Sequence, residues 1–219
     1  MESSEIIKSI NSIYKKYYSP TNLQRHMKQV AAVSALICDN SKMKVDKETI
    51  IATALIHDLA QFVKMELDNG NVNLLDPSDR ERIGFFKQKK KEFIEKYGFN
   101  DNKANTKIAL EIGANKKVID LLKSKEVNPL LPNVYKKFDE KILLYSDLRC
   151  SPQGVVSLEE RLAEGNKRYN FNRDEEHKEF SRRFTLIAKG IEKEMFKKLK
   201  ILPEQINSSS VQKYLDEWS

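Results

Sequence analysis

Apolar residues recur at helical spacing along most of the chain. Residues 3–18 alternate apolar and polar positions in this way and end before a Ser-Pro pair. The next segment, "TNLQRHMKQVAAVSALICDN", repeats the pattern at i, i+4, i+7 and i+11. Its apolar stripe consists of His26, Val30, Val33 and Ile37. We therefore expect His26 to lie on the buried face of a helix.

Three predicted helices start at residues that cap N-termini. Thr21 with Gln24, and Ser157 with Glu160, match the capping box, in which two side chains three residues apart satisfy free backbone N–H groups. Asp46 is a good N-cap for the segment "KETIIATALIHDLAQFVKMEL", which we expect to be one helix from residue 47 to residue 67. Two neighbouring stripes of that helix contain His57 and Asp58, about 100° apart around the axis.

The second half of the chain shows the same amphipathic pattern. We expect an aromatic face through Phe86, Phe93 and Tyr97 beneath a lysine-rich back. Residues 101–125 predict two short helices with a break near Gly113. Beyond them, three further helices are expected. The first has the stripe Val134, Phe138 and Ile142, with the neighbouring inward positions Leu144, Asp147 and Leu148. The second is the capped segment "VVSLEERLAEGNKRY", and the third is a long amphipathic stretch along Phe180, Phe184, Ile187, Ile191, Met195 and Leu199.

Breaks between these segments are few. The polar stretch 68–79 predicts a loop, and the serines at 208–210 predict a break before a short last helix. Glycine and proline account for only 7 and 6 of 219 residues, which favours a helical protein. We predict an all-α fold: a single helical domain over residues 1–200, followed by a C-terminal helical tail, 201–219, that packs back or contacts another subunit.

Composition bears on the compartment and the partners that we expect for the protein. The chain has no 18-residue apolar span and no apolar leader at its start, so we expect a cytoplasmic protein that does not engage a membrane. Its two cysteines, Cys38 and Cys150, are far apart and are expected to be reduced and buried. A net charge of +7 fits phosphate-bearing partners and equally fits a lysine-rich solvated surface.

Four inward positions carry side chains that bind metals. His26, His57, Asp58 and Asp147 all fall on predicted buried stripes, where an unpaired carboxylate or imidazole is costly. Two imidazoles and two carboxylates suit a borderline divalent ion such as Mn²⁺, Fe²⁺, Co²⁺, Ni²⁺ or Zn²⁺. The third histidine, His177, lies in the charged stretch "RDEEHKEF" and is expected on the surface, outside the site.

The order of these residues resembles the HD superfamily of metal-dependent phosphohydrolases. The motifs are "RHMKQVAAV" with His26, "ALIHDLAQF" with His57 and Asp58, and "LLYSDLRC" with Asp147. They span residues 21–150, and the following "SPQGVVSLEERLAEGNKRY" resembles a functionally undefined group of bacterial and archaeal HD proteins. The resemblance implies an HD-type helical bundle and metal-dependent hydrolysis of a phosphate ester.

Three departures from the family pattern refine this expectation. Many HD hydrolases read His-Asp-Ile-Gly-Lys, whereas Gln61 stands here in place of the lysine. No histidine lies between Asp58 and Asp147, and HD members with two or three metals use histidines there, so we expect one ion. Gln61 and Phe62 also occupy the place of the Glu-Asp pair of alarmone hydrolases, which argues against that activity.

The function predicted from the sequence is hydrolysis of a phosphomonoester or phosphodiester of a nucleotide by a metal-activated water. Asp58 is the predicted catalytic residue, as a ligand that also orients the water. Arg25 and Arg149 are the predicted substrate contacts, because each lies close in sequence to a predicted ligand and a cation neutralises phosphoryl charge. The general acid or base is unassigned, and its candidates are Glu66, Asp68 and Glu160.

Two other functions fit the same residues. One is a non-catalytic HD scaffold that binds a nucleotide or a metal, which the missing lysine and the unassigned acid favour. The other is a nuclease or RNA-end processing enzyme, suggested by the basic charge and by the run "KQKKKEF", although a solvated helix face explains that run as well. The oligomeric state does not follow from the sequence.

Overall fold

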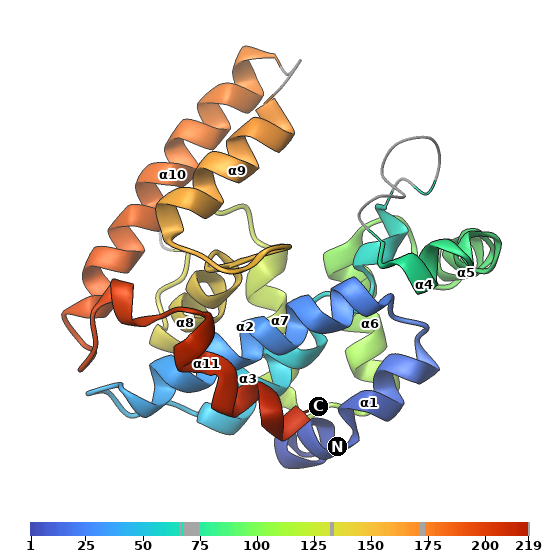
Figure 1. The fold of residues 1–219 in the computed structure, drawn as a ribbon, viewed down its shortest axis with the longest axis horizontal. Coiled ribbons are helices and arrows are strands. Elements are labelled where there is room, and N and C mark those ends of the chain that lie inside the picture. Colours follow the sequence, from blue (N-terminus) through green and yellow to red (C-terminus); the bar gives the residue numbers. More distant parts are fainter. Residues whose placement is uncertain (66, 68–74, 132–133, 171–173, 219) are drawn as a thin grey trace.

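A computed structural model describes residues 1–65, 67, 75–131, 134–170 and 174–218, and these are almost entirely helical (Figure 1). The predicted all-α fold class is confirmed. The described helices and strands are α1 (Ser3–Lys16), α2 (Thr21–Asp39), α3 (Lys47–Ile56), η1 (Gln61–Val63), α4 (Pro77–Arg80), α5 (Ile83–Tyr97), α6 (Asp101–Glu111), α7 (Lys116–Lys123), η3 (Ser124–Glu126), α8 (Phe138–Asp147), β1 (Cys150–Ser151), β2 (Gly154–Val155), α9 (Leu158–Asn170), α10 (Glu175–Phe196), η4 (Pro203–Gln205), α11 (Ser208–Leu215) and η5 (Asp216–Trp218).

Helix α2 is the centre of the bundle. It packs against α3, α8 and α11, and α3 packs in turn against α1 and α7 (Figure 1). Every residue of α2 from Val30 to Cys38 is buried, because neighbouring helices cover all of its sides there. The alanines at 31, 32 and 35 let these helices approach closely. One hydrophobic core therefore supports the helices that carry the predicted metal ligands.

Helix α3 is shorter than the sequence pattern predicts. It ends at Ile56, so His57 and Asp58 lie at its C-terminal end and not within a helix that runs to residue 67. The backbone N–H of Ala60 donates to Oδ1 of Asn105 on α6, at 2.8 Å, instead of continuing the helical ladder. A buried side chain from another helix thus outcompetes the local apolar periodicity.

The start of α2 differs from the predicted capping box. Pro20 is the N-cap, and the N–H of Thr21 donates to Oδ2 of Asp79 on α4, at 2.7 Å. Gln24 does not accept from the N–H of Thr21, the predicted N-cap; its side-chain amide donates to the carbonyl of Ser19. The cap is therefore supplied by a carboxylate 58 residues away, which local sequence does not reveal.

The other two N-terminal caps form as predicted. Oδ1 of Asp46 accepts from the N–H of Thr49, at 3.2 Å. The N–H of Ser157 donates to Oε2 of Glu160, at 2.8 Å, and the N–H of Glu160 donates back to Oγ of Ser157, at 3.1 Å. This capping box fixes the start of α9 directly after the short β1–β2 hairpin, which pairs Cys150 with Val155 and which the sequence pattern did not predict.

Helices α5, α6 and α7 agree with the sequence pattern, whereas the predicted stripe of α10 is buried only toward its C-terminal end: Phe180 is exposed, and Leu199 lies beyond the helix. Phe86, Phe93 and Tyr97 are the buried residues of α5, and Gly113 separates α6 from α7 with a φ of +72°, which glycine adopts without strain. The N-terminal half of α10 has no buried residue, and with α9 it projects from the bundle (Figure 1).

Two predicted breaks are in part helical. The end of the stretch 68–79 forms α4, while residues 68–74 lie outside the described part of the chain. The serines at 208–210 are the first turn of α11, because Asn207 caps that helix by accepting from the N–H of Ser210. The tail packs back on α2: Tyr214 is buried, and its hydroxyl donates to Asp39, at 2.7 Å.

The cysteines and the helix lengths bear on two expectations from composition. Both Cys38 and Cys150 are free and buried, as expected, and burial raises the pKa of the Cys38 thiol to about 12. Among the described residues, none of the helices combines the length and the apolar character that crossing a bilayer requires.

Candidate metal centre

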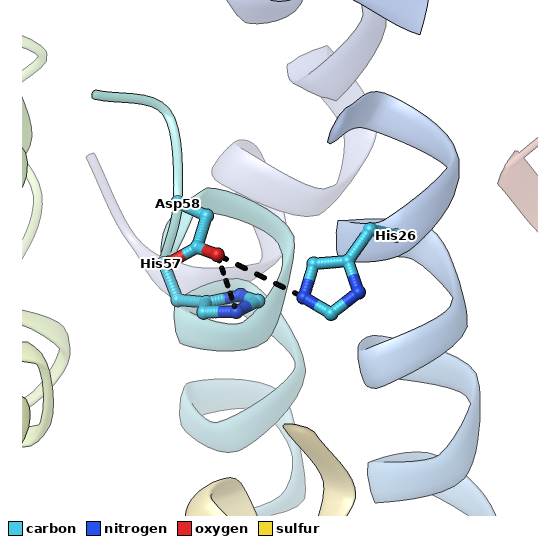
Figure 2. Close-up of side chains that lie close together, drawn as sticks. All are labelled: His26, His57 and Asp58. Atoms are coloured by element: carbon cyan, nitrogen blue, oxygen red, sulfur yellow. Dashed lines mark ion pairs between the residues drawn. The ribbon is translucent and has the colours of Figure 1, made fainter. Parts of the chain in front are cut away.

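Three helices bring the four predicted metal ligands together. His26 lies in the second turn of α2, His57 and Asp58 follow the last turn of α3, and Asp147 is the last residue of α8. Figure 2 shows the imidazoles of His26 and His57 facing the Asp58 carboxylate across the α2–α3 contact. The helix end at Ile56 contributes to this arrangement, because it frees the two adjacent side chains to turn toward the same point.

The ligand atoms approach one another closely. Oδ2 of Asp58 lies 3.7 Å from Nε2 of His26 and 3.5 Å from Nε2 of His57. Oδ1 of Asp147 lies 3.1 Å and 3.7 Å from the same two nitrogens. One ligand atom from each of His26, His57 and Asp58 lies within 4.8 Å of the other two. Asp147 therefore points toward the two imidazoles, as the four-ligand hypothesis requires, but it lies outside the group of three whose ligand atoms are all within 4.8 Å of one another.

The surroundings of His57 are suited to binding a cation. Its side chain is fully buried, and its Nδ1 lies 2.7 Å from the carbonyl oxygen of Ala54. Because a carbonyl only accepts, Nδ1 bears a proton, and in a neutral ring Nε2 would present a lone pair. That Nε2 is buried and has no hydrogen-bond partner. A backbone carbonyl that orients a ring in this way is the usual outer contact of a metal-binding histidine.

The spacing fits a divalent ion. Nitrogen and oxygen ligands about 2.1 Å from an ion lie about 3.0 Å apart at adjacent octahedral positions and about 3.4 Å apart in a tetrahedron. The four nitrogen–oxygen distances between the imidazoles and the carboxylates run from 3.1 to 3.7 Å. Two imidazoles and two carboxylates in this arrangement are a donor set for a borderline metal.

Lys125 is a fifth member of the cluster, and the sequence analysis missed it. Its Nζ donates to Oδ1 of Asp58, at 3.2 Å, and to Oδ2 of Asp147, at 3.3 Å. These are the outer oxygens, while the inner oxygens Oδ2 of Asp58 and Oδ1 of Asp147 face the histidines. Lys125 lies in η3, in the polar stretch "KSKEVNP", where nothing in the local pattern distinguishes it from neighbouring lysines.

Helix α6 holds both halves of the cluster in place. Asn105 accepts from Ala60, two residues after Asp58, and Asn102 donates to the carbonyl of Lys125, at 3.1 Å. One turn further along α6, Thr106 donates to the carboxylate of Glu126, at 2.6 Å. These polar side chains of α6 thus position the turn after His57 and the turn that carries Lys125.

The charges of the cluster stabilise one another. Burial alone would raise the pKa of Asp58 and of Asp147, but the neighbouring ammonium and imidazole groups outweigh it and hold both pKa values below their ordinary range. Burial would lower the pKa of Lys125, but the two carboxylates raise it above its ordinary value. The carboxylates are therefore ionised at neutral pH, as metal ligation requires.

The two predicted substrate arginines are engaged elsewhere. Arg149 is 2% exposed, and its guanidinium donates to the hydroxyl of Tyr145 and to the backbone carbonyls of Val156, Pro203 and Ile206, not to the cluster. Arg25 forms a two-pronged ion pair with Asp76, at 2.7 and 3.1 Å, and not with the cluster. Adjacency in sequence failed because consecutive helical residues point in different directions.

The other candidate residues also fall outside the cluster. Glu160 is committed to the capping box of α9. Glu66 and Asp68 lie outside the described residues. The His177 side chain is about half exposed and pairs with Asp174, in agreement with the surface position predicted for it. No general acid or base is assigned among the described residues.

A small cavity adjoins the cluster. Its volume is about 60 Å³, and Lys125 and Asp147 line it together with Ser124, Tyr135 and Glu140. A larger cavity, about 550 Å³, lies between α9 and α10 and is lined by none of the cluster residues. Any small group that reaches the metal ligands from this side therefore passes Lys125.

Comparison of the chain with family models, with curated protein sequences and with solved structures gives no match. The interpretation of the site therefore rests on the residues of this chain and on their geometry.

Proposed function

We propose that this protein is an HD-type metal-dependent phosphohydrolase that acts on a phosphate ester, with nucleotides as the substrate class. The observation that carries the proposal is the convergence of His26, His57, Asp58 and Asp147 from three helices, with Nε2 of His57 buried and unpartnered. In the interior of a protein most buried polar atoms have a hydrogen-bond partner, and a bound cation would supply one for this nitrogen. The net charge of +7 suits an anionic substrate.

The four residues would hold one divalent ion, of Mn, Fe, Co, Ni or Zn. When bound, such an ion supplies Lewis-acid chemistry: it lowers the pKa of a water and withdraws charge from a phosphoryl oxygen. Asp58 has two tasks in this scheme, because its Oδ2 is a ligand atom and its carboxylate accepts a hydrogen bond that orients a water. The carbonyl of Ala54 holds Nδ1 of His57, which would leave Nε2 to face the ion.

The protein supplies the remaining electrostatics. The carboxylates of Asp58 and Asp147 are ionised and buried beside Lys125, so they neutralise an ion without a proton being displaced at neutral pH. Helix α6 holds the turns on both sides of the cluster, which keeps the ligand atoms in place before anything binds.

The test is metal-dependent turnover. The purified protein is stripped with a chelator, reloaded separately with Mn²⁺, Co²⁺, Ni²⁺ and Zn²⁺, and assayed on nucleoside mono-, di- and triphosphates, cyclic nucleotides and a generic phosphodiester. We expect hydrolysis with at least one ion and its loss in D58N. One bound ion per chain with no turnover on any substrate would contradict the enzyme and support a binding module. Salt-sensitive binding of oligonucleotides would favour a nuclease.

A further inference from the structure

The net charge of the cluster decides whether it can receive an anion. The carboxylates of Asp58 and Asp147 carry two negative charges, and the ammonium of Lys125 carries one positive charge. The carboxyl group of Glu140 lines the cavity beside them. A divalent ion would offset the charges of Asp58 and Asp147. Lys125 would then be the cationic side chain among the residues that line this cavity, and so the one that attracts an anion.

Lys125 is placed to reach such an anion. Its side chain is about one-fifth exposed and lines the 60 Å³ cavity beside Asp147. That volume holds about two water-sized atoms, enough for phosphoryl oxygens and too small for a whole nucleotide. Tyr135 lines the same cavity with a backbone φ of +55°, a conformation that bulky residues rarely adopt.

The hydrogen bonds of Lys125 leave the inner ligand atoms free. Its ammonium contacts Oδ1 of Asp58 and Oδ2 of Asp147, and the opposite oxygen of each carboxylate faces the imidazoles. The lysine therefore serves as the counter-charge of two buried carboxylates without occupying the position between the histidines. Its flexible four-carbon stem can turn toward another anion once the carboxylates are neutralised from the inner side.

We propose that Lys125 is the phosphate-binding residue of this site: it pairs with Asp58 and Asp147 in the metal-free protein and donates to a phosphoryl oxygen of the ligand in the loaded one. The proposal rests on the proposed function, because it requires the ion. It gives Lys125, in η3, the role of substrate contact that the sequence predicts for Arg25 and Arg149. Arg149 donates to the carbonyl of Ile206, and Arg25 is paired with Asp76.

The experiment uses Mn²⁺ and inorganic phosphate as probes, with calorimetric titration of the full chain. Wild type, K125M, K125R and the control K116M are first titrated with Mn²⁺ and then, loaded, with phosphate. Lys116 is a matched control because it is 84% exposed and pairs with Asp120, so its loss removes the same charge from the neighbouring helix α7. We expect one Mn²⁺ per chain in all four proteins, and phosphate binding at least tenfold weaker in K125M alone.

Each other outcome has a definite meaning. Phosphate binding by K125M equal to that of K116M overturns the role of Lys125 and leaves the proposed function intact. Loss of Mn²⁺ binding in a folded K125M also overturns it, because the lysine would then serve the metal ligands. Failure of the wild type to bind Mn²⁺ overturns the proposed function itself.

The metal-free role has its own measurement. Melting of the chelated proteins should show K125M below K116M, because two buried carboxylates then share no cation, and K125R should recover most of the loss. If K125M does not fold, K125R still tests the anion role: it keeps the charge and should keep phosphate binding within about threefold. A tenfold loss in K125R without loss of Mn²⁺ binding would contradict a role that depends on charge.

Discussion

Two polar clusters of this protein differ in whether their hydrogen bonds are complete. Glu111 on α6 accepts from the hydroxyls of Tyr17, at 3.1 Å, and Tyr97, at 2.7 Å, and pairs with Lys96, at 2.7 Å. Both of its carboxylate oxygens are satisfied. At the candidate metal centre, by contrast, Nε2 of His57 is buried without a hydrogen-bond partner.

This difference separates structural from functional polar groups. A buried polar group without a hydrogen-bond partner costs free energy, and an imidazole nitrogen of this kind that faces two carboxylates is suited to receive a cation. A completed cluster needs no ligand, and its loss affects stability alone. We therefore expect the cluster around His57 to govern metal binding and the cluster around Glu111 to govern the free energy of unfolding.

The largest effect is expected from removing a ligand. D58N keeps the shape of the side chain but loses the charge and one of the metal-ligand oxygens, so Mn²⁺ binding and any metal-dependent turnover should fall more than a hundredfold. E111Q makes the equivalent change in the completed cluster and is the control. Calorimetry and turnover assays on both variants measure the contrast, and equal losses in the two would contradict it.

Arg149 should behave as a structural residue. In R149M the backbone carbonyls of Val156, Pro203 and Ile206 lose their donor, so the free energy of unfolding should fall by about 3 kcal/mol. Urea unfolding measures this loss. Below the melting temperature, the loaded variant should bind phosphate like the wild type. A tenfold loss of phosphate binding in the folded variant would restore Arg149 as a substrate contact.

E111Q should cost stability while leaving the metal centre intact. The variant loses the solvent-exposed ion pair with Lys96 and weakens the bonds from the two tyrosines, so the free energy of unfolding should fall by at most about 1 kcal/mol. Saturating Mn²⁺, at about a hundred times the dissociation constant, should add about 2.7 kcal/mol to wild type and to E111Q alike. Thermal unfolding with and without Mn²⁺ checks both numbers. A smaller metal effect in E111Q would show that the clusters are coupled.

The smallest effect is the pH dependence of the Glu111 contribution. Hydrogen bonds from Lys96 and Tyr97 outweigh the effect of burial and lower the pKa of Glu111 to about 2. The carboxylate therefore stabilises the fold fully above its unfolded pKa of about 4.5, and this contribution is lost as the pH falls toward 2. The difference in unfolding free energy between wild type and E111Q should shrink across that range. A difference that stays constant between pH 6 and pH 3 would contradict the role of the charge.

The sequence predicted the parts of the fold that depend on local periodicity. The buried face of α5, the break at Gly113 and the caps at Asp46 and Ser157 all follow from residues within one helical turn of each other. The end of α3 and the start of α2 do not, because Asn105 and Asp79 decide them from other helices. Long-range polar contacts override local pattern at these two points.

The candidate site divides in the same way. His26, His57, Asp58 and Asp147 could be chosen because each is a ligand-type residue on a predicted inward stripe, and the structure places them together. Lys125 has no such signal, since it is one lysine among many, and its role depends on Asn102 holding its backbone. Arg149 was chosen by sequence proximity, and proximity says nothing about where a guanidinium finds its acceptors.

The most direct test of the account is the number of Mn²⁺ ions bound by the chelator-stripped protein, compared between wild type and D147N. Asp147 comes from α8, which follows the other two ligand-bearing helices in the chain. Replacing it therefore tests whether all three helices contribute to one centre. We expect one Mn²⁺ ion per wild-type chain and Mn²⁺ binding at least a hundredfold weaker in D147N. Wild-type protein that takes up no ion, or a D147N variant that binds as tightly as wild type, would contradict it.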